Sequence, residues 1–178
     1  GDQPPLRRVG KYPVVKLLGS GASSAVFLCH DPCNDRDVAV KVVSTALFED
    51  PQRGKLFKKL FVTEASLAGK LQHPHIVQIY DAVAEDRLNY IVMEYVDGGT
   101  LEKFCTPDSL LPIEQVVEMT FKCTRALAFA HRKGITHRDI KPANIPPAGR
   151  SDVTFPPPRA ATLPPAGTPQ HAAPGPPP

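Results

Sequence analysis

The sequence has few cysteines, no long apolar run and no concentration of charge. Its four cysteines contain no CxxC pair, which argues against a zinc site or a disulfide framework and predicts reduced thiols. No signal peptide is recognisable and no apolar run approaches the roughly 20 residues of a membrane span, so we expect a cytoplasmic segment without a membrane part. The net charge of +3 gathers in no basic stripe, and we expect no nucleic-acid partner.

Proline divides the chain into two parts. Twelve of the 21 prolines lie in residues 146–178, a segment with no lysine and one acidic residue, Asp152. This composition buries too little apolar surface to offset the entropy of ordering, so we expect residues 146–178 to form a disordered tail with polyproline II character. Residues 156–159 and 163–165 are loose matches to ligands of SH3 or WW domains, so an adaptor with a proline-rich tail is one alternative.

Residues 1–145 alternate between strand-like and helix-like patterns. Short apolar runs that favour strands occur at 12–18, 25–29, 38–43, 76–83 and 88–95. Helical spacing is found at 55–71, with Leu56, Leu60, Ala65 and Leu67 among the apolar positions, and at 113–131, with Val117, Phe121, Leu127 and Phe129. The order predicts an α+β fold in which a small antiparallel sheet with one helix precedes a helical region.

Two segments suit the binding of phosphate. The turn from Gly19 to Gly21 joins two strand-like runs, and glycines there let backbone amides approach phosphates, although a plain hairpin has the same pattern. Lys41 ends the apolar run that begins at Val38, and a buried ammonium needs an anion, either a phosphate or a carboxylate such as Glu64. The alternative is an edge-strand lysine whose amine reaches water.

The string His-Arg-Asp-Ile-Lys-Pro-Ala-Asn at residues 137–144 is far more specific. Asp139 can accept the proton of an attacking hydroxyl, and Lys141 can neutralise a transferred phosphoryl group. Asn144 can bind a metal ion through its amide oxygen. We expect His137 to organise the backbone and not to titrate in catalysis.

In this order, the glycine turn, the Val-Ala-Val-Lys strand, the helix glutamate and the 137–144 string resemble the eukaryotic-type (Hanks-type) serine/threonine protein kinases, especially bacterial members. The resemblance implies a kinase N-lobe at 9–97, with a five-stranded antiparallel sheet plus one helix. It implies that residues 98–145 hold the hinge exit, the first C-lobe helices and the catalytic loop, 137–144. The implied function is transfer of the ATP γ-phosphate to a serine or threonine hydroxyl of a protein substrate, with ATP and Mg²⁺ as cofactors.

The resemblance also implies roles for single residues. Lys41 would hold the α- and β-phosphates and pair with Glu64. Asp139 would be the catalytic base, Lys141 a phosphate partner and Asn144 a metal ligand. The other residues implied to contact the nucleotide are Gly19, Gly21, Val26, Ala39, the gatekeeper Met93 and the hinge residues Glu94 and Val96.

The resemblance ends after the catalytic loop. The family places an Asp-Phe-Gly motif about eighteen residues beyond the catalytic aspartate, where this chain has Pro157, Pro158 and Arg159. Pro146 and Pro147 replace two leucines, one of which forms the adenine floor. Without Asp-Phe-Gly, an activation segment or Ala-Pro-Glu, we expect an incomplete magnesium site and an inactive chain, for which a nucleotide-binding, pseudokinase-like module is the alternative.

The missing C-lobe helices have a second consequence. The helix at 113–131 would expose about six apolar side chains that those helices should cover. The free energy of burial lost in this way is about 10 kcal/mol. We therefore expect poor solubility, or folding limited to residues 9–97. The chain begins with Gly1 and not with methionine, which suits a piece of a longer protein. The resemblance to bacterial members leaves open whether the full-length parent has a membrane anchor. A shifted reading frame, an abnormal splice, a damaged gene model and a purposeful tail all stay open as origins of residues 146–178.

Overall fold

The computed structural model describes residues 7–49, 53–85 and 87–146. Within these ranges, six strands form one antiparallel sheet in the order β1-β2-β3-β4-β6-β5. The strands are β1 (Arg8–Val9), β2 (Tyr12–Ser20), β3 (Ser24–Asp31), β4 (Arg36–Val43), β5 (Ile79–Ala84) and β6 (Asn89–Glu94). The helices are α1 (Gly54–Gly69) and α2 (Ile113–Arg132), with the short 3₁₀ helices η1 (Thr45–Leu47), η2 (Leu101–Phe104), η3 (Pro107–Ser109) and η4 (Pro142–Asn144).

The five expected strands are all present, and the sheet gains a sixth. The added strand β1 has only two residues and pairs with the start of β2, with Val9 opposite Tyr12. Gly10, at a φ of +53°, allows the tight connection between them, since this backbone conformation is open to glycine. A two-residue strand is too short to show alternation in sequence, and the expectation of five strands therefore missed it.

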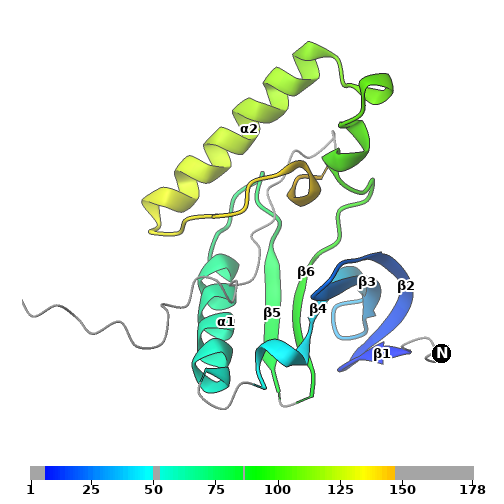
Figure 1. The fold of residues 1–178 in the computed structure, drawn as a ribbon, viewed down its shortest axis with the longest axis vertical. Coiled ribbons are helices and arrows are strands. Elements are labelled where there is room, and N and C mark those ends of the chain that lie inside the picture. The colour runs from blue at the N-terminus through cyan, green and yellow to red at the C-terminus, as the bar shows by residue number, and fades with distance from the viewer. Residues whose placement is uncertain (1–6, 50–52, 86, 147–178) are drawn as a thin grey trace, which may run out of the picture.

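Helix α1 covers one face of the sheet. It lies along β5 (Figure 1) and buries the stripe Phe57, Phe61, Ala65 and Ala68. Phe48 packs edge-to-face on Phe57 and Phe61, with ring centroids 4.9 and 5.5 Å apart. These three aromatic rings belong to the core between α1 and the sheet, together with Val43, Ala65 and Ile91.

The apolar stripe that the helical spacing suggested for α1 is only partly the buried one. Ala65 lies in the core, but Leu56 and Leu67 are 47% and 43% exposed. The helix carries two apolar stripes side by side, and the sheet takes the one that holds two phenylalanines. A phenylalanine buries more area than a leucine, so this choice is the more favourable of the two.

The inner side of the curled sheet holds a second core. It consists of Val9, Tyr12, Cys29, Val38, Val40, Tyr90 and Val92. The rings of Tyr12 and Tyr90 meet edge-to-face at 6.2 Å. No disulfide joins the four cysteines, which all lie in the described ranges, and burial raises the pKa of the Cys29 thiol to about 11.

Helix α2 stands apart from the sheet and extends one residue past its expected end (Figure 1). A small cluster of Leu71, Ile76, Ala126 and Ala130 joins it to the segment that follows α1. Its far side is open, and the large apolar side chains exposed there are Ile113, Val116, Val117 and Phe121. This exposure confirms the expectation that the helix shows uncovered apolar residues. Among the described residues, no helix is both long and apolar enough to cross a membrane.

Candidate functional site

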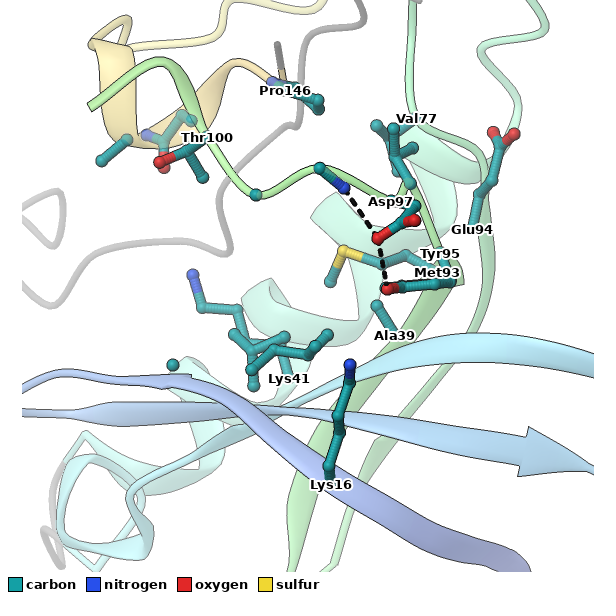
Figure 2. Close-up of a pocket in the computed structure, with 18 residues that line it drawn as sticks. Lys16, Ala39, Lys41, Val77, Met93, Glu94, Tyr95, Asp97, Thr100 and Pro146 are labelled. Carbon is teal, nitrogen blue, oxygen red and sulfur yellow. Dashed lines mark hydrogen bonds between the residues drawn. The ribbon is translucent and has the colours of Figure 1, made fainter. Parts of the chain in front are cut away.

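A cavity of about 510 Å³ lies between the sheet and the 137–144 segment (Figure 2). This volume is ordinary for a site that binds a small molecule. Three regions distant in sequence line it: the β2–β4 surface, the segment after β6 and the end of the described chain. The residues predicted for the nucleotide or metal that line the cavity are Gly19, Val26, Ala39, Lys41, Met93, Glu94, Val96 and Asn144.

The end of β2, which leads into the turn between β2 and β3, forms the roof of the cavity. Gly21 donates its backbone amide to the Ser24 carbonyl at 2.8 Å, which closes the hairpin. A Cβ placed on Gly19 would meet no atom within 4 Å, so packing does not require glycine there. Because Gly19 lines the cavity, the missing side chain leaves room for a ligand beside the backbone. Gly21 is not among the lining residues.

Lys41 and Glu64 come from different layers of the fold. Lys41 lies in β4, opposite Val26 of β3, and lines the cavity. Glu64 lies on α1, and its Oε1 is 3.5 Å from Nη1 of Arg138 in the 137–144 segment. The expected pairing of Glu64 with Lys41 stays a prediction, and the pairing with Arg138 was not anticipated.

The segment after β6 forms the back wall of the cavity. The backbone amide of Glu94 donates a hydrogen bond to the backbone carbonyl of Gln78 at 2.8 Å. In return, the Glu94 carboxylate accepts a hydrogen bond from the backbone amide of Gln78 at 3.4 Å. Figure 2 shows the Glu94 side chain directed away from Lys41, so the backbone of this residue faces the cavity more than its carboxylate does. Met93, next to it, projects its sulfur into the cavity.

A polar cluster closes the outer end of this wall. The Tyr95 hydroxyl donates to Oδ1 of Asp97 at 3.0 Å, and the Gly98 amide donates to the same oxygen at 2.8 Å. These two hydrogen bonds lower the pKa of Asp97 below its ordinary value, and the nearby Lys16 and Lys103 add to the effect. Two glycines at positive φ then turn the chain toward η2.

The 137–144 segment brings its polar residues together. Asn144 donates its side-chain amide to the carbonyl of Asp139 at 2.8 Å and to Oδ2 of Asp139 at 3.0 Å. Lys141 Nζ lies 3.2 Å from the same Oδ2. Asn144 therefore uses its side-chain nitrogen, and not its side-chain oxygen, in these two hydrogen bonds.

His137 shapes the turn that holds Asp139. It is buried, and its Nδ1 accepts the backbone amide of Asp139 at 3.1 Å. Arg138, between them, has a φ of +65°, a conformation that a residue with a side chain adopts only when its surroundings hold it. The expectation that His137 organises the backbone is confirmed by this bond.

Several lining residues were not predicted as ligands. Pro146, already identified as the substitute for a floor leucine, is buried and lines the cavity from the side opposite Ala39 (Figure 2). Leu18 directly precedes Gly19, so its place beside the turn was a usable signal. Tyr95 lies within the predicted hinge and Ala143 within the 137–144 string, although neither was named as a ligand. The remaining unpredicted lining residues are Lys16, Val77, Asp97, Gly98, Gly99 and Thr100. Their contribution follows from how the chain folds back, which no local pattern reveals.

The donor set fits a nucleotide better than it fits a complete magnesium site. The cavity offers apolar walls, a roof at Gly19 without a side chain and two lining lysines, Lys16 and Lys41, which suit a base, a sugar and phosphates. Among the described residues, no group of three or more His, Cys, Asp or Glu side chains is placed to hold a metal ion. Mg²⁺ prefers six oxygen ligands, and Asn144 supplies one amide oxygen, while Asp139 is engaged by Lys141.

Residues 12–148 match the family model described as the protein kinase domain. The chain belongs to the protein kinase family. Among its curated relatives, this kinase chain is 43% identical over 139 residues to the serine/threonine-protein kinase PknB of Mycobacterium leprae. It is 39% identical over 136 residues to the serine/threonine-protein kinase PrkC of Bacillus subtilis. Both alignments cover 76% of this chain, and they confirm the expected resemblance to bacterial serine/threonine kinases.

Solved structures agree with the sequence relatives. The kinase domain of Mycobacterium tuberculosis PknI matches with a TM-score of 0.68 and 31% sequence identity. The match covers 83% of this chain and 60% of that domain, which confirms the kinase N-lobe fold with the start of the C-lobe. The chain spans 20% of PrkC and 22% of PknB, so it corresponds to about a fifth of these relatives.

Proposed function

We propose that this chain is the ATP-binding part of a serine/threonine protein kinase, which transfers the γ-phosphate of ATP to a hydroxyl of a protein substrate. The observation that carries the proposal is that Lys41, the Met93–Val96 wall and Asn144 line a single cavity. These groups come from the sheet, the connection after it and the 137–144 segment. If one of these motifs matched the kinase pattern only by chance, the three segments would not be expected to line the same cavity.

The proposed roles follow from chemistry and position. Lys41 neutralises the α- and β-phosphates, and its ammonium approaches them beneath the roof at Gly19. The backbone of the hinge at Glu94 and Val96 hydrogen-bonds the base. The base packs between Val26 and Ala39 on the sheet side and Pro146 on the opposite side of the cavity. The glycine turn ending at Gly21 covers the phosphates, with Glu64 as the carboxylate that positions Lys41.

The proposed catalytic step depends on the 137–144 segment. Asp139 accepts the proton of the substrate hydroxyl, and Lys141 stabilises the transferred phosphoryl group. Bound Mg²⁺ supplies charge neutralisation of the phosphates, and Asn144 is the residue of this chain suited to hold it. Since an ATP-dependent kinase must work where ATP is present, we place this part of the protein in the cytoplasm.

The incomplete donor set favours a second candidate for the chain as it stands, which is nucleotide binding with little or no phosphoryl transfer. Phosphoryl transfer depends on charge neutralisation, so a missing metal carboxylate should lower the rate by orders of magnitude. Recognition of SH3 or WW domains by residues 156–165 lies outside the described residues and stays a prediction.

Thermal unfolding of the full chain with and without ATP tests the binding proposal. With MgATP at about 100 times its dissociation constant, binding stabilises the fold by about 2.7 kcal/mol. For a domain of this size, the melting temperature should then rise by roughly 5–10 °C. Lys41→Ala should abolish the rise, whereas Lys59→Ala, on the outer side of α1, should retain it. If the original chain shows no nucleotide-dependent rise, the ATP-binding proposal is wrong for this chain.

Phosphate transfer from radiolabelled ATP to a mixture of serine- and threonine-containing peptides separates the two candidates. A rate that falls on Asp139→Asn supports catalysis by this chain. A thermal shift without detectable transfer supports nucleotide binding alone.

A further inference from the structure

The outer side of α1 carries apolar side chains that the sheet does not use. Leu56 and Leu67 are 47% and 43% exposed, and Leu60 between them is half-buried. These positions follow each other at four and seven residues, so they form one stripe about 16 Å long. The buried stripe with Phe57 and Phe61 already provides the packing of α1 on the sheet, so the leucine stripe has no role in that contact.

Lysines border this stripe along the helix. Lys55, Lys59 and Lys70 are exposed on its neighbouring edge. The only acidic residue of α1 is Glu64, which is engaged by Arg138 on the side of the catalytic loop. The outer side of the helix therefore carries positive charge without an acidic residue of its own.

The placement of Lys55 opposes helix stability. It lies in the first turn, where the helix dipole favours acidic side chains, and α1 has no acidic residue there. At this end of α1, the Lys55 ammonium and the positive end of the helix dipole have the same sign. Lys55 is thus unfavourable for the helix and gains no packing in return. Residues that break such a local preference are expected where the side chain serves binding.

We propose that the α1 outer face, formed by Leu56, Leu60, Leu67, Lys55, Lys59 and Lys70, docks an acidic amphipathic helix of a partner protein. A helix with apolar residues at the same spacing fills the leucine stripe, and carboxylates along one flank meet the lysines. The three leucines offer a contact below the roughly 1,200 Å² of a standard interface, so the complex is transient.

Other occupants fit the α1 outer face less well. A second copy of this face would bring lysines against lysines. Residues 146–178 contain a single acidic residue, Asp152, and so lack complementary charge. A helix bound to a lipid surface buries its apolar side about 5–10 Å deep in the headgroup boundary. Leu56 and Leu67, less than half exposed on a helix packed against a sheet, do not project that far.

A fluorescein-labelled peptide helix tests the proposal by fluorescence polarisation with the full chain. The probe has leucines at the spacing of Leu56, Leu60 and Leu67 and glutamates along one flank. A peptide of the same composition, with its leucines distributed around the helix, is the peptide control. The variants are Lys55→Glu/Lys59→Glu and Leu67→Ser. Arg7→Glu/Arg8→Glu changes the net charge equally at exposed sites in and beside β1, at the opposite edge of the sheet from β5, along which α1 lies.

We expect saturable binding of the probe, weakened about tenfold or more in Lys55→Glu/Lys59→Glu and in Leu67→Ser. The Lys55→Glu/Lys59→Glu variant should melt at the same or a higher temperature, because glutamate suits the first turn, so lost binding cannot be assigned to unfolding. Arg7→Glu/Arg8→Glu should change the affinity by less than about twofold.

Four results would overturn the proposal. They are an absence of saturable binding by the original chain, equal binding of the control peptide, an equal loss in Arg7→Glu/Arg8→Glu, and sedimentation with phosphatidylserine vesicles that requires Lys55 and Lys59. The last result would assign the α1 outer face to a lipid surface.

Discussion

The Arg138 guanidinium lies 3.5 Å from the Glu64 carboxylate, so a helix that covers the sheet is tied to the catalytic loop. Both side chains are partly open to water, at 54% and 33% exposure. A double-mutant cycle with Arg138→Gln and Glu64→Gln should give a coupling of about 0.2–1 kcal/mol in urea unfolding. The coupling should vanish near 1 M NaCl, because salt screens exposed pairs. A coupling unchanged by salt would mean that the pair is shielded from solvent.

Replacement of a buried polar side chain should stabilise the sheet. Asn89 of β6 is fully buried, and within the described part of the chain neither its side-chain oxygen nor its nitrogen has a hydrogen-bond partner. Asn89→Val should raise the free energy of unfolding by about 1 kcal/mol, since it removes unpaired polar groups and suits a strand. Asn34→Ala is the opposite case, because Asn34 donates to Asp31 at 2.7 Å, and it should lower stability by about 1 kcal/mol. A loss in Asn89→Val would contradict this account.

Stability should fall in mild acid through His73. Burial lowers the pKa of His73 below its ordinary value of 6.5, and the nearby His75, Arg125 and Arg132 lower it further. The unfolded chain then binds more protons than the folded chain, so stability is full above about pH 6.5 and decreases as the pH falls toward the lower folded-state pKa. His73→Asn retains an acceptor for the His75 amide and should flatten this dependence in urea unfolding at a series of pH values. An equally steep dependence in the variant would assign the effect to another group.

The open side of α2 should control self-association. Val117 and Phe121 are each 62% exposed on it. Val117→Gln/Phe121→Glu should reduce the mass measured by light scattering at high concentration, with a change in stability within about 0.5 kcal/mol. The glutamate introduced at position 121 would also lie one turn before Arg125, a favourable spacing for an ion pair. Met119→Glu, at a buried position of the same helix, should instead destabilise the chain. Unchanged association in the double variant would show that this side is not the cause.

The sequence predicted those parts of the fold that depend on local pattern. The strand runs, both helices and the glycine turn were placed to within a few residues, because each has its own periodicity or turn chemistry. The catalytic loop was recognisable because its chemistry needs fixed residue types at fixed spacing. Lys41 and Asn144 could be assigned to one site only through the family, since nothing local relates residues about a hundred positions apart.

What the sequence could not predict depends on tertiary contacts. Spacing alone could not decide whether the Leu56 or the Phe57 stripe of α1 faces the sheet, because both are apolar at helical intervals. The Glu64–Arg138 pair joins residues that only the folded chain brings together. Likewise, Pro146 was noticed as a departure from the family, but its burial against the cavity depends on the path of the chain after η4.

The cavity joins the early part of the chain to its last described residue. Its roof at Gly19 and its wall at Met93 precede its floor, formed by Ala143, Asn144 and Pro146. During synthesis, the sheet and the wall therefore leave the ribosome before the floor exists. A chain that stopped at residue 97 would retain the sheet, but its nucleotide site would be an open surface and not a pocket. Nucleotide can then act on folding only at its final stage, by favouring the docking of the catalytic loop beneath a sheet that has already formed.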